Sequence, residues 1–556
     1  MKVALLSNIN IDPLNRKLSN TENEIYNSRG YGNELGVMLN KESTLYSYKP
    51  EIIFVLIDIM ELIHHNIEIK EATNYINEWF ALVEGSIKEE IIYYITDAYL
   101  YGFEMKVVWG ERDKEHIENI WNEKLYRLMS THSNIRIFPY NSVVRKLGEK
   151  DAFSNKMWYM GKILHSNLLQ KVLFEEIKHK IEVEKRQPKK VLLLDLDNTL
   201  WRGLAGENDI NPIVLSEDGV GLAYKNFQRA IKYIKKQGVV LGIVSKNNED
   251  DALNIIDNHP HMVLRREDFA TQRINWDNKA DNIASIAKEL NIGLDSIVFI
   301  DDNKAEQTLV KEMLPQVCVP KFPDNAEELT DFITEIYHKY FEKPVVTSED
   351  ANKTEQYKLN LKRMELQKSS VDYNGYLDSL KMKMQRVDPI KNKERLLQLM
   401  NKTNQFNLTT KRFTEQELSE ILHDEKKEVF LYDVSDKFGD NGIVAAVIVE
   451  YSKEAVIIEF TMSCRVMGRK IEDAIIKQIE TTVKNKGYNN LVGLYKPTEK
   501  NKPVENLYTS FGYKIKKTYD NGIREYSYDL NDELKRDIHV DIIRGEEYAR
   551  KNHCPY

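Results

Sequence analysis

The amino-acid sequence predicts an α/β protein in which a central parallel sheet is preceded by a second α/β domain and followed by an α+β domain. Two observations predict this layout. Over the first 343 residues, short β-branched runs alternate with amphipathic helical stretches, as in parallel sheets covered by helices. Beyond about residue 370 the strand-like runs come nearly in succession, as in an antiparallel sheet. A chain of 556 residues has room for about three or four domains.

The composition is that of an ordinary globular protein. Apolar residues make up 42% of the chain and charged residues 30%, which excludes a disordered or collagen-like chain. The net charge of −8 offers no bulk attraction to nucleic acid or to an anionic membrane. The N-terminal apolar run is too short for a signal peptide, and the run at 52–60 falls short of the roughly 20 residues of a membrane helix. With three scattered cysteines, we expect a cytoplasmic protein with neither nucleic acid nor membrane as a partner.

Changes in pattern divide the chain into five segments. The first alternation has strand-like runs that begin at Val3, Ile52 and Ile135, and it ends in a charged stretch with one proline near 182–190. A Lys- and Glu-rich stretch at 347–370 is typical of a solvated, helical connector. We predict an N-terminal α/β domain at 1–183, a central catalytic domain at 188–343, a connector at 344–372, an α+β domain at 373–535 and a tail at 536–556.

The most informative segment places two aspartates at the end of a buried strand. The apolar residues of VLLLDLDNTLW lead to Asp195, and Asp197 and Thr199 follow in the turn. In an open parallel sheet, ligands bind at the carboxyl ends of the strands. Two carboxylates at such a point can divide the labour of phosphoryl transfer, because one can attack phosphorus while the other gives and takes a proton.

Phosphoryl transfer of this kind needs positive charge, because a carboxylate and a phosphate repel each other. Later segments offer the groups required. Ser245 in IVSKNN can hold a phosphate oxygen, and Lys279 in NWDNK stands at a predicted helix start, where an anion is favoured. VFIDDN ends a third strand with Asp301 and Asp302, which suit Mg²⁺. Each piece alone is compatible with a helix cap, a solvated turn or a surface lysine, but their joint occurrence in this order favours a site.

The spacing of these pieces leaves no room for a large cap domain. Asp195 and Ser245 are 50 positions apart, Ser245 and Lys279 are 34 apart, and Lys279 and Asp301 are 22 apart. We therefore expect a rather open pocket, which suits a bulky or macromolecular reactant better than a sealed metabolite site does.

In residue type, placement and order, the four pieces resemble the haloacid dehalogenase (HAD) superfamily. The stretch from DLDNTLW through VVLGIVSKNNEDDA, INWDNK and LDSIVFIDDN, with KTNQFNLTTKRF, KFGDNGIVA and SCRVMGR later, is similar to the FkbH-like (HAD class IIIC) proteins over about 150–515. The resemblance implies removal of phosphate from 1,3-bisphosphoglycerate and loading of the glyceryl group onto the phosphopantetheine thiol of an acyl carrier protein. The product would feed polyketide or related natural-product biosynthesis.

The resemblance also implies roles for the residues named above. Asp195 would be the nucleophile and Asp197 the acid/base. Phosphate would be held by Thr199, Ser245 and Lys279, and Mg²⁺ by Asp195, Asp197, Asp301 and Asp302.

The sequence departs from the family pattern at two places. Some members carry a cysteine between the two aspartates, where this chain has Leu196, so a glyceryl-cysteine intermediate at that position is excluded. Many members have two glycines after the tryptophan, whereas here Trp201 is followed by Arg202. Two alternatives to glyceryl transfer stay open: a HAD phosphatase that acts on a sugar phosphate or another small metabolite, and a docking scaffold with a vestigial site.

The C-terminal segment AVIIEFTM followed by SCRVMGRKIEDAI resembles a GNAT acetyltransferase fold. The loop of such a fold cradles the pyrophosphate of coenzyme A, and its counterpart here contains Arg465, Gly468 and Arg469 as residues that would bind pantetheine. Pantetheine or carrier-protein binding, acetyl transfer with Tyr508 as the acid, and a purely structural role all remain open. Phe406 either lines a groove shared with the central domain or belongs to a connection.

The N-terminal domain resembles an SGNH-hydrolase-like domain with Ser7 at the end of its first strand. It lacks the glycine and aspartate usual beside that serine and a clear Asp-x-x-His, so we expect a non-catalytic role in docking or assembly.

Overall fold

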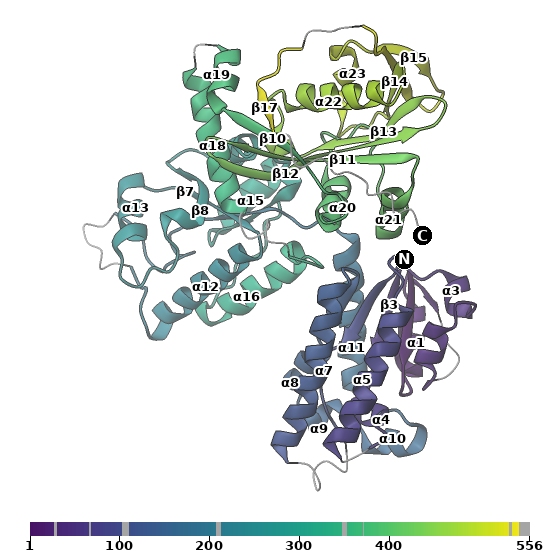
Figure 1. Ribbon diagram of the computed structural model, residues 1–556. Helices are drawn as coiled ribbons and strands as arrows, with labels where there is room; N and C mark the ends of the chain where they lie inside the picture. The colour runs from purple at the N-terminus through teal and green to yellow at the C-terminus, as the bar shows by residue number, and fades with distance from the viewer. Residues whose placement is uncertain are drawn as a thin grey trace. The chain divides into compact units, whose positions relative to one another are not determined.

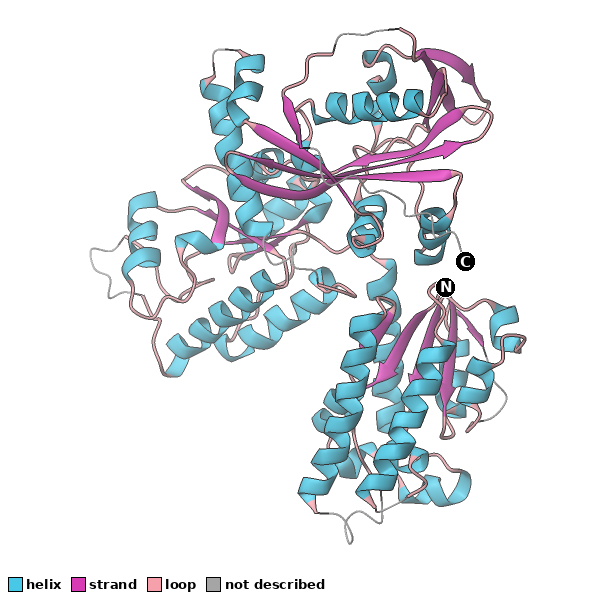
Figure 2. Ribbon diagram, in the orientation of Figure 1, coloured by secondary structure: helices cyan, strands magenta, loops and turns pink. Residues whose placement is uncertain are grey.

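The computed structural model describes residues 1–26, 31–65, 68–102, 110–206, 213–346, 353–370, 372–532 and 536–543. The chain forms two compact units, one of Met1–Arg186 with Thr414–Glu417 and one of Gln187–Phe413 with Leu418–Tyr556 (Figure 1). Figure 2 shows that both units combine helices with sheets, as predicted for an α/β protein. Within the described ranges no helix is both long enough and apolar enough to cross a membrane.

The first unit has a parallel sheet of order β2-β1-β3-β4-β5, the doubly wound arrangement. The sequence predicted β1, β3 and β5 but not β2 or β4. The strands are β1 Lys2–Ser7, β2 Glu24–Tyr26, β3 Ile52–Leu56, β4 Ile92–Thr96 and β5 Ile135–Phe138. Its helices are α1 Asp12–Ser19, α2 Glu34–Leu39, α3 Thr44–Tyr48, α4 Ile59–Leu62, α5 Ile69–Ser86, α7 Glu111–Thr131, α8 Tyr140–Leu147, α9 Glu149–Ala152, α10 Asn155–Gly161 and α11 Asn167–Lys185.

Two cores form on the two faces of this sheet, because the middle of β1 and the whole of β3 are apolar and send alternate side chains to either face. Side chains of α5 and α7, among them Trp79 and Trp121, pack on one face. Side chains of α1, α8 and α11, among them Leu14 and Leu173, pack on the other.

The second unit begins with a parallel sheet of order β8-β7-β6-β9. Its strands are β6 Val191–Leu194, β7 Val240–Ser245, β8 Phe269–Ile274 and β9 Ile297–Ile300, of which β8 was not predicted. Residues of α12 and α16 pack on one face, and residues of α14 and α15 on the other. The helices are α12 Gly219–Lys236, α13 Glu249–Asn258, α14 Lys279–Glu289, α15 Lys304–Met313 and α16 Leu329–Ile336.

The register of this sheet decides where the candidate site lies. Leu194 of β6 pairs with Ile243 of β7 on one side and with Ile300 of β9 on the other. All three strands are parallel, so the residues that follow them emerge together at one edge. This is the HAD-like layout that the motifs predict.

The rest of the second unit is built on an eight-stranded mixed sheet of order β15-β16-β14-β13-β12-β11-β10-β17. Its strands are β10 Met382–Val387, β11 Lys427–Asp436, β12 Gly439–Tyr451, β13 Ala455–Met462, β14 Asn490–Tyr495, β15 Lys514–Thr518, β16 Arg524–Asp529 and β17 Val540–Ile543. Its helices are α19 Tyr373–Leu380, α20 Lys393–Lys402, α21 Glu415–His423, α22 Ile471–Asn485 and α23 Leu507–Ser510. The arrangement, with α22 crossing between the parallel strands β13 and β14, is the GNAT-like α+β fold predicted.

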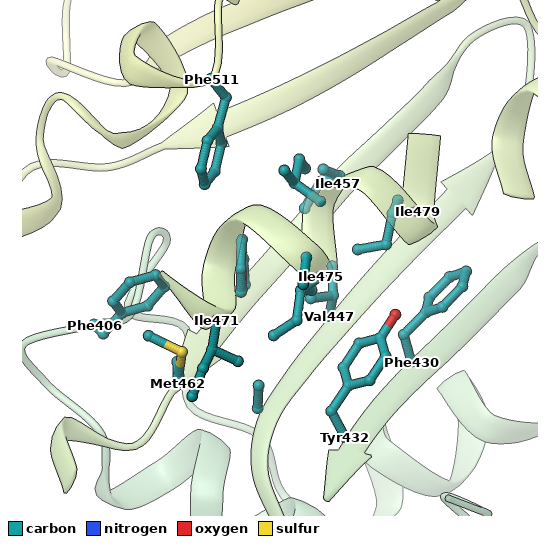
Figure 3. Close-up of a cluster of buried hydrophobic side chains, with 14 of the residues drawn as sticks. Phe406, Phe430, Tyr432, Val447, Ile457, Met462, Ile471, Ile475, Ile479 and Phe511 are labelled. Atoms are coloured by element: carbon teal, nitrogen blue, oxygen red, sulfur yellow. The ribbon is translucent and has the colours of Figure 1, made fainter. Parts of the chain in front are cut away.

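The helix α22 lays its apolar stripe on this sheet. Ile471, Ile475 and Ile479 are fully buried against Val447 and Ile457, as Figure 3 shows. These positions recur at four-residue intervals, so they share one face of the helix.

Two predicted boundaries need correction. The predicted tail at 536–556 contains β17, which pairs in parallel with β10 as the edge strand of the large sheet. The predicted connector contains α18 Lys353–Ser369, which is helical as expected but not merely solvated. Tyr357 and Leu361 pack on the core of the central sheet, and Leu366 packs on the core of the GNAT-like sheet. Arg363 of the same helix is only 2% exposed.

Candidate active site at the ends of the central strands

The parallel strands of the central sheet deliver three charged side chains to one point. Asp195 follows β6, Asp301 follows β9, and Lys279 is the first residue of α14. Lys279 Nζ lies 3.0 Å from Asp195 Oδ2 and 2.6 Å from Asp301 Oδ2. The three residues are 5%, 3% and 0% exposed in the order Asp195, Lys279, Asp301. Charged groups that are so deeply buried need partners of opposite charge, and here Lys279 is the partner of both aspartates.

Electrostatics keeps the lysine charged. Burial alone would lower the pKa of Lys279, but the carboxylates of Asp195 and Asp301 outweigh burial and raise the pKa above its usual value. Burial and the charge of Asp195 raise the pKa of Asp301 to about 6, against the effect of Lys279. The site therefore holds more negative charge than Lys279 alone compensates.

That excess of negative charge fits a divalent cation. Carboxylate oxygens of Asp195, Asp301 and Asp302 lie within 4.8 Å of one another. Asp195 Oδ1 is buried and accepts no hydrogen bond from any group in the described residues. A buried carboxylate oxygen without a donor is costly unless a cation meets it, and hard divalent cations prefer such oxygen ligands.

The neighbouring turn joins Thr199 to the same group. The backbone N–H of Asp302 donates to Thr199 Oγ1 over 3.2 Å, and Thr199 Oγ1 donates to Asp302 Oδ1 over 3.3 Å. Burial and the charge of Asp195 raise the pKa of Asp302. The turn after β6 and the turn after β9 are thus tied together, which holds Asp302 beside Asp195.

Asp197 is not one of the three residues whose carboxylate oxygens cluster, and its predicted role as a metal ligand stays a prediction. Its Oδ1 accepts from Trp201 Nε1 over 2.9 Å and from the Ala205 N–H over 3.0 Å, and its Oδ2 accepts from Asn247 Nδ2 over 2.8 Å. Burial raises the pKa of Asp197 to about 6 in spite of the bonds to Ala205 and Trp201. A carboxyl group fixed in this way and with this pKa suits proton transfer near neutral pH.

Two further residues of the site, Asn247 and Tyr224, were not predicted from the sequence. Asn247 comes two residues after Ser245, and its only signal was the polar run after the strand. The Tyr224 hydroxyl, on α12, donates to the Asn198 carbonyl over 3.2 Å. Ser245 itself is buried at the end of β7, where its carbonyl accepts from the Asn275 N–H over 3.1 Å. Its role as a phosphate ligand stays a prediction.

The predicted pantetheine residues hold the chain's own helix α18. Arg363 of α18 donates to both carboxylate oxygens of Asp436, over 2.7 and 2.8 Å. Arg469 is 5% exposed and donates to Asp436 over 3.3 Å and to Asn360 of α18 over 2.8 Å. Arg469 therefore helps to hold α18 in place, and pantetheine binding by this residue stays a prediction.

The other two predicted pantetheine residues contact α18 and α19. The Arg465 guanidinium donates to Gln356 of α18, and the Gly468 carbonyl accepts from the Tyr373 hydroxyl at the start of α19. Both residues and Arg469 line a hollow of about 640 Å³, open solvent included, whose other walls come mainly from α14, α18 and α19. Pantetheine binding there stays a prediction.

A segment before β11 fills the split between β13 and β14. The two strands pair only from Ala455–Ile457 with Leu491–Gly493, and then they separate. Leu408 N–H donates to the Phe460 carbonyl over 3.1 Å, and the Leu408 carbonyl accepts from the Lys496 N–H over 2.8 Å. The chain itself therefore supplies the partners of the split edges.

The side chains of this part of the sheet are also closed off. Phe406 is 2% exposed and packs beside Met462 and Ile471 (Figure 3), so it belongs to a core and not to an interdomain groove. Tyr508 is 1% exposed, and a Cβ added at Gly493 would come within 2.3 Å of its ring. Gly493 thus makes room for a buried tyrosine, which does not suit the role of an acetyltransferase acid.

In the first unit, Ser7 is a structural residue of the strand end. Its hydroxyl donates to the Leu56 carbonyl over 2.6 Å and accepts from the Ile9 N–H over 3.2 Å. It is 5% exposed. The non-catalytic role expected for this domain stays a prediction.

Comparison with known proteins adds one informative neighbour. No protein-family profile and no curated protein matches this sequence. The N-terminal part of the protein BF1531 from Bacteroides fragilis, whose structure contains a phosphatase domain complexed with Mg, is 27% identical. The match covers 62% of this chain and 94% of that chain, with a TM-score of 0.51. The ribosomal-protein-S18-alanine N-acetyltransferase of Escherichia coli matches at 10% identity over 27% of this chain and 98% of its own, with a TM-score of 0.21.

Proposed function

We propose that this chain is a Mg²⁺-dependent enzyme of the HAD type that removes phosphate from 1,3-bisphosphoglycerate and loads the glyceryl group onto the phosphopantetheine thiol of an acyl carrier protein in the cytoplasm. The observation that carries the phosphoryl chemistry is the buried cluster of Asp195, Lys279 and Asp301 at the strand ends. The Mg found in the Bacteroides fragilis neighbour supports the choice of metal. The substrate and the carrier rest on the resemblance to FkbH-like proteins.

Three aspartates of this chain would hold the metal: Asp195, Asp301 and Asp302. When bound, Mg²⁺ neutralises part of the charge of the phosphate and of the aspartates, so that a carboxylate can approach phosphorus. Lys279 adds a fixed positive charge at the same point, since its pKa is raised.

The first chemical step uses both carboxylates of the DxD segment. A carboxylate oxygen of Asp195 attacks the phosphorus of the phosphate ester, which leaves the acyl phosphate intact, and forms a new P–O bond while the bond from phosphorus to the ester oxygen breaks. Protonated Asp197 gives its proton to that leaving oxygen. In the second step, ionised Asp197 takes a proton from water, whose oxygen displaces Asp195 from phosphorus and releases inorganic phosphate.

Glyceryl loading is a separate exchange at carbon. The carrier thiol attacks the carbonyl carbon of the acyl phosphate, a C–S bond forms, the C–O bond to phosphate breaks, and the thiol proton leaves with the phosphate. Leu196, buried between the two aspartates, offers no thiol to carry the acyl group. Direct transfer from the acyl phosphate to the carrier is therefore the simplest route.

Intact-protein mass spectrometry tests the proposal. The protein is mixed with 1,3-bisphosphoglycerate, Mg²⁺ and a carrier protein with its phosphopantetheine arm, and a carrier without the arm is the control. We expect a glyceryl mass on the armed carrier alone. Release of phosphate with an unmodified carrier would support a plain phosphatase instead. If neither phosphate nor a glyceryl-loaded carrier is formed, both functions are contradicted.

A further inference from the structure

We propose that Lys246 binds a second anionic group of the substrate, a carboxylate or an acyl phosphate remote from the reacting phosphorus, and that Glu306 holds the lysine in place for this task. The inference deepens the proposed function and rests on it for the reacting phosphate. It makes Lys246 a specificity-determining residue and Glu306 a positioning residue.

The backbone brings Lys246 to the edge of the sheet at which the candidate catalytic groups lie. Lys246 directly follows Ser245, the last residue of β7, and β7 is the neighbour of β6, the strand that leads to Asp195. The next residue, Asn247, donates from Nδ2 to Asp197 Oδ2 over 2.8 Å. Lys246 therefore stands between the end of a central strand and a residue that contacts the acid/base.

The side chain of Lys246 spans the end of β6. Its Nζ lies 2.7 Å from Glu306 Oε1, in the first turn of α15. This helix follows β9, which lies on the other side of β6 from β7. The next residue of the helix, Gln307, donates from Nε2 to the Asp301 carbonyl over 2.7 Å. The lysine thus reaches from the end of one flanking strand to the helix after the other, across the strand that carries Asp195.

Among the described residues, Glu306 serves Lys246 alone. Glu306 Oε1 accepts from Lys246, whereas Oε2 is buried and accepts no hydrogen bond from any described group. An ammonium has three N–H donors, and Glu306 is its one acceptor in the part of the chain that the structure describes. Two donors therefore remain for a ligand. Because the lysine is already held in place, less conformational freedom is lost when the ligand binds.

Lys246 lies nearer to solvent than the groups that would meet the reacting phosphate. Its side chain is 34% exposed, whereas that of Lys279 is 4% exposed and that of Asp301 is fully buried. A phosphate that approaches Asp195 enters the buried part of the site, so the rest of the substrate points toward solvent. The ammonium of Lys246 lies on that outward side.

The charge balance calls for a cation there. One lysine, Lys279, lies among four carboxylates, those of Asp195, Asp197, Asp301 and Asp302. Even a bound divalent cation leaves these groups net negative, so a second anionic group would be repelled unless another positive charge met it. An ammonium with two unused donors can meet it through charge-assisted hydrogen bonds.

Two matched ligands test the inference without turnover. 4-Phosphonobutanoate and butylphosphonate carry the same phosphonate, which cannot be hydrolysed, but only the first has a carboxylate. Titration calorimetry with Mg²⁺ gives the ratio of their Kd values for the wild type, for Lys246→Gln and for Lys246→Arg. We expect the wild type to prefer 4-phosphonobutanoate. This preference should fall about tenfold in Lys246→Gln, because one charge-assisted interaction is lost, and by less in Lys246→Arg, which keeps the charge.

The matched control is Lys304→Gln. Lys304 belongs to the same turn of α15, and its Nζ lies 3.4 Å from Asp324 with the side chain 76% exposed. Its replacement removes the same charge and should leave the Kd ratio within about twofold of the wild type. An equal ratio in wild type and Lys246→Gln would overturn the inference, even if both affinities fell, because Lys246 would then act on the shared phosphonate. An equal fall in Lys304→Gln would overturn it as well, because any nearby charge would suffice.

Hydrolysis of p-nitrophenyl phosphate by the wild type separates this outcome from failure of the proposed function. Hydrolysis together with an unchanged Kd ratio would refute the role of Lys246 alone. A Kd ratio that depends on Lys246, without hydrolysis of any phosphate ester, would support the anion site and count against the phosphoryl chemistry.

Discussion

Replacing Asn247 by alanine should raise the pKa at which the acid/base of the site titrates. The Asn247 amide donates to Asp197 Oδ2 over 2.8 Å, and two other donors reach Oδ1. A donor stabilises the ionised carboxylate, so its removal favours the protonated form. Burial already holds the pKa of Asp197 at about 6.

The size of the effect follows from the hydrogen bond. A bond to a charged group contributes about 1.5–3 kcal/mol, and one pKa unit corresponds to about 1.4 kcal/mol. Because water would replace part of the lost bond, we expect a rise of about one unit, to a pKa of about 7 for Asp197. Asp197 must be protonated to act first as an acid, so activity should persist to higher pH.

The assay is the pH dependence of kcat/KM for a phosphate ester between about pH 4.5 and 9. Its alkaline limb should move up by about one unit in Asn247→Ala. Asn282→Ala is the control, because the Asn282 amide donates to Asn275 over 2.8 Å and not to Asp197. If kcat/KM falls equally at every pH and the alkaline limb does not move, Asn247 acts through packing alone. The assignment of Asp197 as the proton donor would then lose its support.

Three further outcomes are expected. Asp195→Asn should abolish turnover while the circular dichroism spectrum is kept; residual turnover above about 1% would contradict its role as the nucleophile. Asp301→Asn should weaken Mg²⁺ binding about 100-fold by calorimetry, since a metal-binding carboxylate is lost; unchanged affinity would place the metal elsewhere. Burial raises the pKa of Asp58 from 3.8 to about 7 in the folded protein. The protonated carboxyl therefore contributes its full stability below pH 3.8, the pKa in the unfolded chain. That stability is lost as the pH rises through about 7. Asp58→Asn should remove that loss, worth up to about 4 kcal/mol for a shift of about three units, and raise Tm at pH 8 more than at pH 5.

Much of the fold could be predicted because buried parallel strands are apolar throughout. β6, β7 and β9 are runs of this kind, and all three were found. β8 was missed, because its sequence FATQRI carries Gln272 and Arg273, which are only partly buried. In the first unit β4 was missed although it is apolar, and its two tyrosines are almost fully buried.

The candidate site was predictable as far as strand ends determine it. Asp195, Lys279 and Asp301 meet because parallel strands end at one edge, and a sequence shows where strands end. Asn247 and Tyr224 reach the site through the path of the loop after β7 and the packing of α12, which no spacing rule encodes.

For the C-terminal motif, the sequence gives the residue types but not the partners of their side chains. The residue types of Arg465, Gly468 and Arg469 suit an anion-binding loop, but both arginines have partners on α18, and Asn360 lies more than 100 positions before Arg469 in the chain. Whether an arginine is free to bind a ligand depends on such distant partners, and the motif alone does not contain them.

The buried guanidinium of Arg363 has a practical consequence for anyone who divides this protein. Cutting the chain between α18 and the GNAT-like sheet would strip Asp436 of its bidentate donor and uncover apolar side chains of that sheet, whereas cutting before α18 would uncover apolar side chains of the central sheet. A fragment that contains the central sheet or the GNAT-like sheet without this helix should therefore express poorly. For the same reason, neither half should be easy to exchange for that of another protein on its own.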